Sequence, residues 1–175
     1  MSSISGILCQ IITGNVGGAG TDGRVYLGLG GREFRLDSSA DDYEKHSWRE
    51  YILGAAPEGP NLSPPQVRVR NADRNDPRQG LPLGSDSLSR TPTYLRFEPQ
   101  GVGDDWDLAF AAVLVYGEQF ITAYTLPADF HNLWLGKASG TVVYLTNEWR
   151  LGDQALLDAG RQLARKLGLR APRTA

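Results

Sequence analysis

Apolar and polar residues alternate along most of this chain, as in β-strands that bury one face. The alternation is clearest between the glycine-rich segment 14–23 and the acidic segment 37–45, where two short strands flank Gly30-Gly31. A Gly-Gly pair between alternating segments is typical of a two-residue hairpin turn. In all, the pattern predicts strands at 4–13, 24–29, 32–36, 47–53, 66–70, 93–97, 108–116, 119–126, 133–135 and 141–145.

The connections between these strands differ in character. Gly117-Glu118 is expected to join two adjacent strands, and 133–135 and 141–145 are expected to form a closing hairpin around 137–140. The long polar segment 71–92 is expected to be a functional loop or an insertion, because structureless connections of that length are uncommon in compact domains.

The period of the pattern changes near the C-terminus. Apolar residues recur there at helical spacing, with Asp153 early and Gly168 placed to end the helix. The recurring residues are Leu156, Leu157, Ala159, Leu163, Ala164 and Leu167. The sequence therefore predicts an all-β antiparallel β-sandwich over 1–146, followed by a C-terminal α-helix and basic tail over 147–175.

Composition limits the function classes. The chain has 175 residues, 41% of them hydrophobic, and a formal net charge of −2. The length suits one domain, and the charge argues against nucleic-acid binding. No leader-like or membrane-spanning apolar run is visible, so a cytoplasmic protein is expected. The single cysteine, Cys9, lies on an alternating strand and is expected to be a buried, inert thiol. The oligomeric state is left open.

Catalytic motifs are sparse. Gly18–Gly23 matches G-x-G-x-x-G, but the residues that follow alternate, so the helix that a dinucleotide site requires is missing. Two histidines and one cysteine do not make a zinc site of the usual spacing, and there is no G-x-S-x-G motif. A non-catalytic binding module is expected. Two alternatives remain: a small metal-dependent hydrolase or lyase that uses the acidic loops, and a purely protein–protein interaction or structural subunit.

Two acidic clusters are candidates for cation binding. Asp37, Asp41 and Asp42 lie within six residues, and Asp104, Asp105 and Asp107 form a second group. Neighbouring carboxylates repel one another unless they are solvated or share a cation, and Ca²⁺ prefers oxygen ligands of this kind. On local sequence alone, solvated loop charges are favoured.

A longer motif changes the picture. Residues 13–27, T-G-N-V-G-G-A-G-T-D-G-R-V-Y-L, resemble the T-G-D-x-x-G-A-G-T-D-A-x-V-Y-I signature of PLAT (lipoxygenase-homology) domains. Residues 33–38 resemble the family's F-x-L-D-N segment, and 42–45 its D-x-F-E-x-G. Residues 66–70 resemble its basic strand, and Asp105-Trp106 with the apolar strand after it resembles its tryptophan segment. This resemblance implies a PLAT-like β-sandwich.

The resemblance also implies a calcium site. Carried over by position, the ligands would be Thr21, Asp22, Asp37, Ser38, Ala40, Asp41, Asp42 and Asp105. The chain departs from the family at Gly18, where some members carry an acid, at Ser38, which replaces asparagine, and at Ala40, which replaces glycine. One shared site is therefore expected rather than a full set.

PLAT domains act as docking modules, so the resemblance implies a lipid or membrane surface, or a protein partner, as the ligand. The contact residues expected from exposed aromatic and basic character are Trp106, Trp134, Arg165 and Lys166. Trp106 has a competing interpretation, in which it packs between the sheets.

Overall fold

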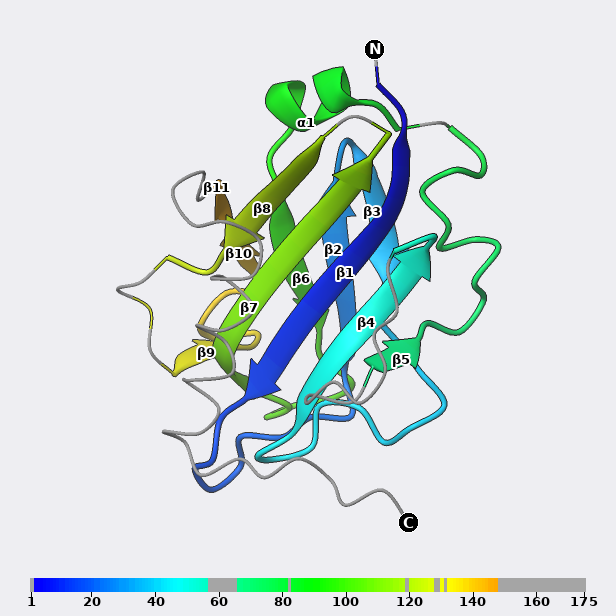
Figure 1. Cartoon of the computed structure of the whole chain (residues 1–175). Coiled ribbons are helices and arrows are strands. Elements are labelled where there is room, and N and C mark those ends of the chain that lie inside the picture. The colour runs from blue at the N-terminus through cyan, green and yellow to red at the C-terminus, as the bar shows by residue number, and fades with distance from the viewer. Residues whose placement is uncertain are drawn as a thin grey trace.

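Two β-sheets face each other and bury the apolar face that the alternation predicts (Figure 1). The structure is a computed structural model, and it describes residues 2–56, 66–81, 83–118, 120–127, 130 and 132–147. The predicted C-terminal helix, Arg165 and Lys166 lie outside the described residues. No helix among the described residues is long and apolar enough to cross a bilayer.

The larger sheet has seven strands in the order β11-β8-β7-β1-β4-β5, with β9 also paired to β7. Its strands are β1 (Ile4–Thr13), β4 (Trp48–Gly54), β5 (Gln66–Arg68), β7 (Trp106–Gly117), β8 (Ile121–Thr125), β9 (Leu133–Leu135) and β11 (Thr146–Asn147). The smaller sheet has the order β10-β6-β2-β3, made of β2 (Arg24–Leu29), β3 (Arg32–Arg35), β6 (Tyr94–Glu98) and β10 (Val142–Tyr144). All pairs are antiparallel except β4 with β5. The predicted all-β sandwich is confirmed.

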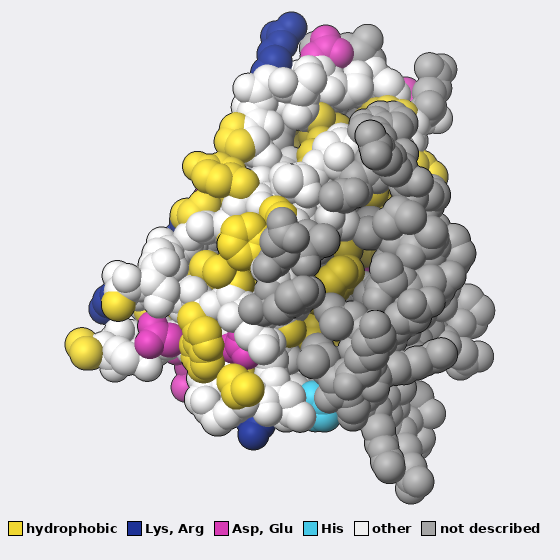
Figure 2. Space-filling view, turned by 90° about the vertical axis from the view of Figure 1, so that its left-hand side faces the viewer, with side chains coloured by type: hydrophobic (Ala, Val, Ile, Leu, Met, Phe, Trp, Pro, Cys, Tyr) yellow, Lys and Arg dark blue, Asp and Glu magenta, His cyan; other side chains and the backbone are white. Residues whose placement is uncertain are grey.

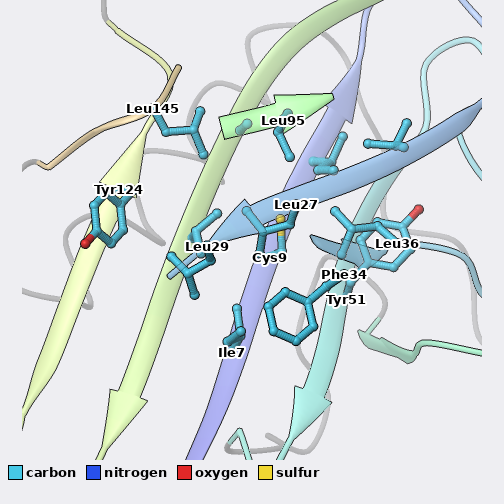
Figure 3. Close-up of a cluster of buried hydrophobic side chains, with 14 of the residues drawn as sticks. Ile7, Cys9, Leu27, Leu29, Phe34, Leu36, Tyr51, Leu95, Tyr124 and Leu145 are labelled. Atoms are coloured by element: carbon cyan, nitrogen blue, oxygen red, sulfur yellow. The ribbon is translucent and has the colours of Figure 1, made fainter. Parts of the chain in front are cut away.

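The core lies between the two sheets. Ile7 and Cys9 of β1 and Tyr51 of β4 point toward Leu27 of β2 and Phe34 of β3 (Figure 3). All five side chains are fully buried. Cys9 is therefore a buried free thiol, as expected from its strand, and burial raises its pKa far above the ordinary value.

The end of the sandwich differs from the prediction. Leu133–Leu135 and Val142–Tyr144 do not pair as a hairpin, because β9 pairs with β7 in the large sheet and β10 pairs with β6 in the small one. A bridge between Gly136 and Gly140 closes the turn that crosses between the sheets. Both strands alternate equally well, so the local pattern does not specify which sheet each one joins.

The segment 71–92 holds an element that the sequence did not indicate. Ser85–Arg90 forms a short helix, α1, at the opposite end of the sandwich from the glycine-rich segment 14–23 (Figure 1). None of its six residues is buried, so it has no apolar face that periodicity would detect.

Candidate functional site

Three loops meet at one end of the sandwich, and we call residues 14–23, 36–47 and 99–105 the loop end (Figure 1). Backbone hydrogen bonds hold the first two loops together: Thr21 N donates to Tyr43 O at 3.2 Å, and His46 N donates to Gly14 O at 2.9 Å. Strand β7, which directly follows the third loop, joins them through Asp107 N, which donates to Ala19 O at 3.1 Å. The long glycine-rich motif therefore lies at the centre of this end.

A polar cavity of about 170 Å³ opens at the loop end. Six of the predicted calcium ligands line it: Thr21, Asp22, Asp37, Ala40, Asp41 and Asp42. Arg24, Arg35 and Arg70 line it as well. The structure thus brings together most of the predicted calcium ligands, although both acidic and basic side chains line the cavity.

The loop itself uses two of these carboxylates. Asp42 Oδ2 accepts a hydrogen bond from Ser38 N at 2.6 Å, and its Oδ1 accepts one from Ser38 Oγ at 2.8 Å. Asp37 forms an ion pair with Arg35 at 3.2 Å. Asp42 therefore closes a turn on Ser38, which is the common structural role of aspartate in loops.

In this arrangement Asp37 and Asp42 already bond other protein groups. Ca²⁺ requires six to eight oxygen atoms at about 2.3–2.6 Å. Among the described residues, no three histidine, cysteine, aspartate or glutamate side chains gather closely enough to hold a metal. The calcium set stays a prediction that rests on the resemblance.

In the third loop, Asp104 rather than Asp105 approaches the motif. Thr21 Oγ1 donates a hydrogen bond to Asp104 Oδ1 at 2.5 Å, and Gln100 N donates to Asp104 Oδ2 at 2.6 Å. Asp105 instead points at Gly136, where an added Cβ would lie 1.6 Å from Asp105 Oδ1. Sequence reasoning chose the acid adjacent to the tryptophan, and nothing local distinguishes the two aspartates.

Trp106 belongs to the core, so its assignment as a surface contact is corrected. Its side chain is fully buried, and its Nε1 donates a hydrogen bond to Thr13 Oγ1 at 3.0 Å. Its ring contacts Tyr43 at 5.3 Å and Phe97 at 5.8 Å between centroids. Burial raises the pKa of Tyr43, which keeps the phenol that donates to Leu36 O protonated. The competing interpretation, packing between the sheets, is confirmed.

Trp134 on β9 is half-buried, and its contact role stays a prediction. Two exposed apolar residues at the loop end escaped the sequence analysis. Val16 is 43% exposed and Val102 is 100% exposed. Figure 2 shows hydrophobic side chains next to acidic ones at this lower end of the molecule. The sequence feature that could have indicated these two residues is an apolar residue next to glycines, as in Gly101-Val102-Gly103 and Val16-Gly17-Gly18.

Comparisons with known proteins give fold-level likeness only. No family model and no curated protein matches the chain. Among solved structures, alpha toxin from Clostridium absonum is 20% identical over 83% of this chain and 32% of its own, with a TM-score of 0.49. Coral 8R-lipoxygenase, described with calcium activation through a C2-like domain, is 17% identical over 90% of this chain and 19% of its own, also at 0.49.

The chain therefore spans about a third of that toxin and about a fifth of that lipoxygenase. These similarities are too low to carry the activity or the calcium dependence of either protein over to this chain. PLAT-like remains a description of resemblance, based on the motif at 13–27.

Proposed function

We propose that this chain is a binding module that docks on a lipid surface through its loop end. The observation that carries the proposal is the placement of Val16 and Val102, two exposed apolar side chains on neighbouring loops. The hydrogen bond between Thr21 and Asp104 fastens these two loops to each other. Apolar side chains that are held in place beside polar groups are suited to insertion at the boundary between headgroups and acyl chains.

The energy scale favours weak, reversible docking. Full burial of a valine side chain contributes about 1.5 kcal/mol, or roughly a factor of ten in partitioning. Exposed Lys45 in the second loop and Lys137 in the turn before β10 place positive charge near the same end. Acidic Asp22 and Asp41 lie exposed beside the cavity and offset that charge. Apolar insertion therefore supplies the affinity, and a weak dependence on salt is expected.

The proposed docking does not require calcium. Because Asp42 is engaged by Ser38 and Asp37 by Arg35, we expect equal binding with a chelator and with added Ca²⁺. The alternative of a metal-dependent hydrolase or lyase needs these same carboxylates, and no observation in the described residues favours it.

The test is flotation of the full chain with phosphatidylcholine vesicles, with and without phosphatidylserine, in chelator and in Ca²⁺. Val16→Asp and Val102→Asp are compared with Leu81→Asp. Leu81 is 70% exposed and lies toward the other end of the sandwich. The Leu81→Asp variant therefore adds the same negative charge away from the loop end. We expect the two valine variants to lose about tenfold in vesicle binding and the Leu81 variant to bind like the parent chain.

Two results would contradict the proposal. One is a parent chain that does not float with any of these vesicles, which would favour the protein partner that the sequence left open. The other is equal binding by all three variants, which would place the lipid contact elsewhere on the molecule.

A further inference from the structure

The outer faces of the two sheets differ in chemistry. The small sheet presents an ion-pair network to solvent: Arg96 contacts Glu33 at 2.7 Å, and Arg24 contacts Glu98 at 3.0 Å. The Arg96 guanidinium also lies over the Tyr26 ring, 4.1 Å from its centroid. A polar face of this kind is what a solvated sheet surface requires.

The large sheet presents apolar residues instead. Ile7, Cys9 and Ile11 of β1 face the core, so the alternating residues of that strand point to the other side. We call this side the outer face. Its residues are Leu8, Gln10 and Ile12 of β1, Trp48, Glu50 and Ile52 of β4, Ala112 and Leu114 of β7, and Ala123 of β8. A sheet that is apolar on both faces is normally covered on both.

The outer face is in fact buried. Leu8 and Ile52 are 3% exposed and Leu114 is 1% exposed. The described residues that pack around them all come from the large sheet itself or from Ala56, just after β4. Side chains standing on one sheet face do not bury one another to this extent, so another part of the molecule must cover them.

Gln10 gives a second sign of a cover. It pairs in register with Ala112 on one side and Glu50 on the other, so it lies in the middle of the outer face. The side chain is 1% exposed, and neither its Nε2 nor its Oε1 has a hydrogen-bond partner. A buried amide without partners costs about 1–3 kcal/mol, so hydrogen bonding does not explain the burial of Gln10, and we attribute the burial to the cover.

We propose that the C-terminal segment 148–175 docks on the β7–β8 half of the outer face as an amphipathic helix. The place where this segment begins supports the proposal. Residue 148 follows Asn147, the last residue of β11, and β11 pairs with β8 at the edge of the same sheet. A helix over 153–167 would be about 22 Å long. The distance from β8 across β7 and β1 to β4 is about 14 Å. The segment therefore reaches the face and is long enough to cross it.

Its composition matches the face. The segment carries six leucines, at 151, 156, 157, 163, 167 and 169. In a helix, Leu156, Leu163 and Leu167 share one side, with Asp158 and Arg165 opposite. The segment also carries basic residues from 161 to 173, with no acid among them. The competing stretch 57–65 follows Ala56 on the β4 side and has one large apolar residue, Leu62.

The test measures whether the outer face is covered in the full chain. Ala112→Cys puts a small thiol in the middle of the β7 part of that face, where the residue is 2% exposed. Native Cys9 lies on the same sheet but faces the core, so its reaction with a thiol reagent reports global unfolding. Peptide mass spectrometry resolves the two sites and separates undocking from unfolding.

Leu163→Asp is then added to undock the segment, and Gln162→Asp is the matched control. Both changes add one negative charge, and they differ only in the side of the helix that they alter. We expect Leu163→Asp to raise the labelling rate at position 112 by tenfold or more. The Cys9 rate should remain unchanged, and Gln162→Asp should match the parent.

Three results would overturn the proposal. The first is rapid labelling at position 112 in the parent chain. The second is no difference between the two charge variants. The third is labelling that slows as protein concentration rises, which would assign the cover to a second copy of the chain.

Discussion

Thr21 Oγ1 donates a hydrogen bond of 2.5 Å to Asp104 Oδ1, and it joins two loops whose residues are 83 positions apart in the chain. The same carboxylate accepts Gln100 N, so it organises the third loop and anchors it to the first. Val102 lies between Gln100 and Asp104, so this contact closes the turn that carries the exposed valine.

The first prediction concerns this contact. Asp104→Asn removes the charge and replaces one of the two accepting oxygens with a donor, so it should lower the free energy of unfolding by about 1–2 kcal/mol. Asp105→Asn is the matched control and should change it by no more than about 0.5 kcal/mol. Urea unfolding of the full chain measures both. Equal losses would show that the two aspartates share the anchoring role.

A second prediction follows from close approach at Gly14. A Cβ at Gly14 would lie 1.9 Å from Asp107 Oδ2, so Gly14→Ala forces one of the two to move. We expect it to destabilise the chain by about 1–3 kcal/mol. In an Asp107→Ala background the same change should cost much less, because the obstructing carboxylate is gone. A double-mutant cycle without coupling would contradict this prediction.

The small sheet gives a pH prediction. The hydrogen bond from Arg96 holds the pKa of Glu33 below its usual value. A lowered pKa in the folded state contributes stability above the pKa of the unfolded state, and that contribution is lost as pH falls through the folded value. Glu33→Gln should therefore reduce stability near pH 7, by less than about 1 kcal/mol for this partly exposed pair.

The difference should shrink between pH 7 and pH 3, because the parent carboxylate takes up a proton as the pH falls toward and through the lowered pKa of the folded state. Glu44→Gln, at an exposed loop position, is the control. Urea unfolding at both pH values checks the sign. A Glu33→Gln penalty that is the same at pH 3 and pH 7 would exclude the ion pair as its source.

Cys9 provides a prediction about reactivity. Its side chain is fully buried in the core, and burial raises the pKa of the thiol, which keeps it protonated. It should react with thiol reagents only as fast as the native chain unfolds, and denaturant should accelerate the reaction. Rapid modification of the folded chain would show that the core beside β1 opens locally.

The strands were predictable because each buries one face, and alternation reports that directly. β1 and β2 begin and end at the predicted residues, and the Gly30-Gly31 turn joins β2 to β3. The sheet assignment of β9 and β10 was not predictable, because it depends on which distant strand each one meets. Helix α1 gave no signal because none of its residues is buried.

The sequence predicted the location of the candidate site better than the bonding of its side chains. The motif at 13–27 indicated loops that meet at one end of the sandwich, and four of the five predicted acids, all but Asp105, line one cavity there. Their bonding was not visible in the sequence: whether Asp42 binds an ion or Ser38 depends on the path of a loop. Val102 was missed because one apolar residue between glycines has no periodicity.

The most direct test of lipid docking places a reporter at the tip of the loop end. Val102→Cys is labelled with a polarity-sensitive fluorophore in the folded chain, where Cys9 is buried and should not react. Leu81→Cys, labelled in the same way, is the control. Phosphatidylcholine vesicles should shift the emission of the label at position 102 to shorter wavelength and leave the label at position 81 unchanged. Equal shifts at both positions, or a shift at neither, would contradict docking through the loop end.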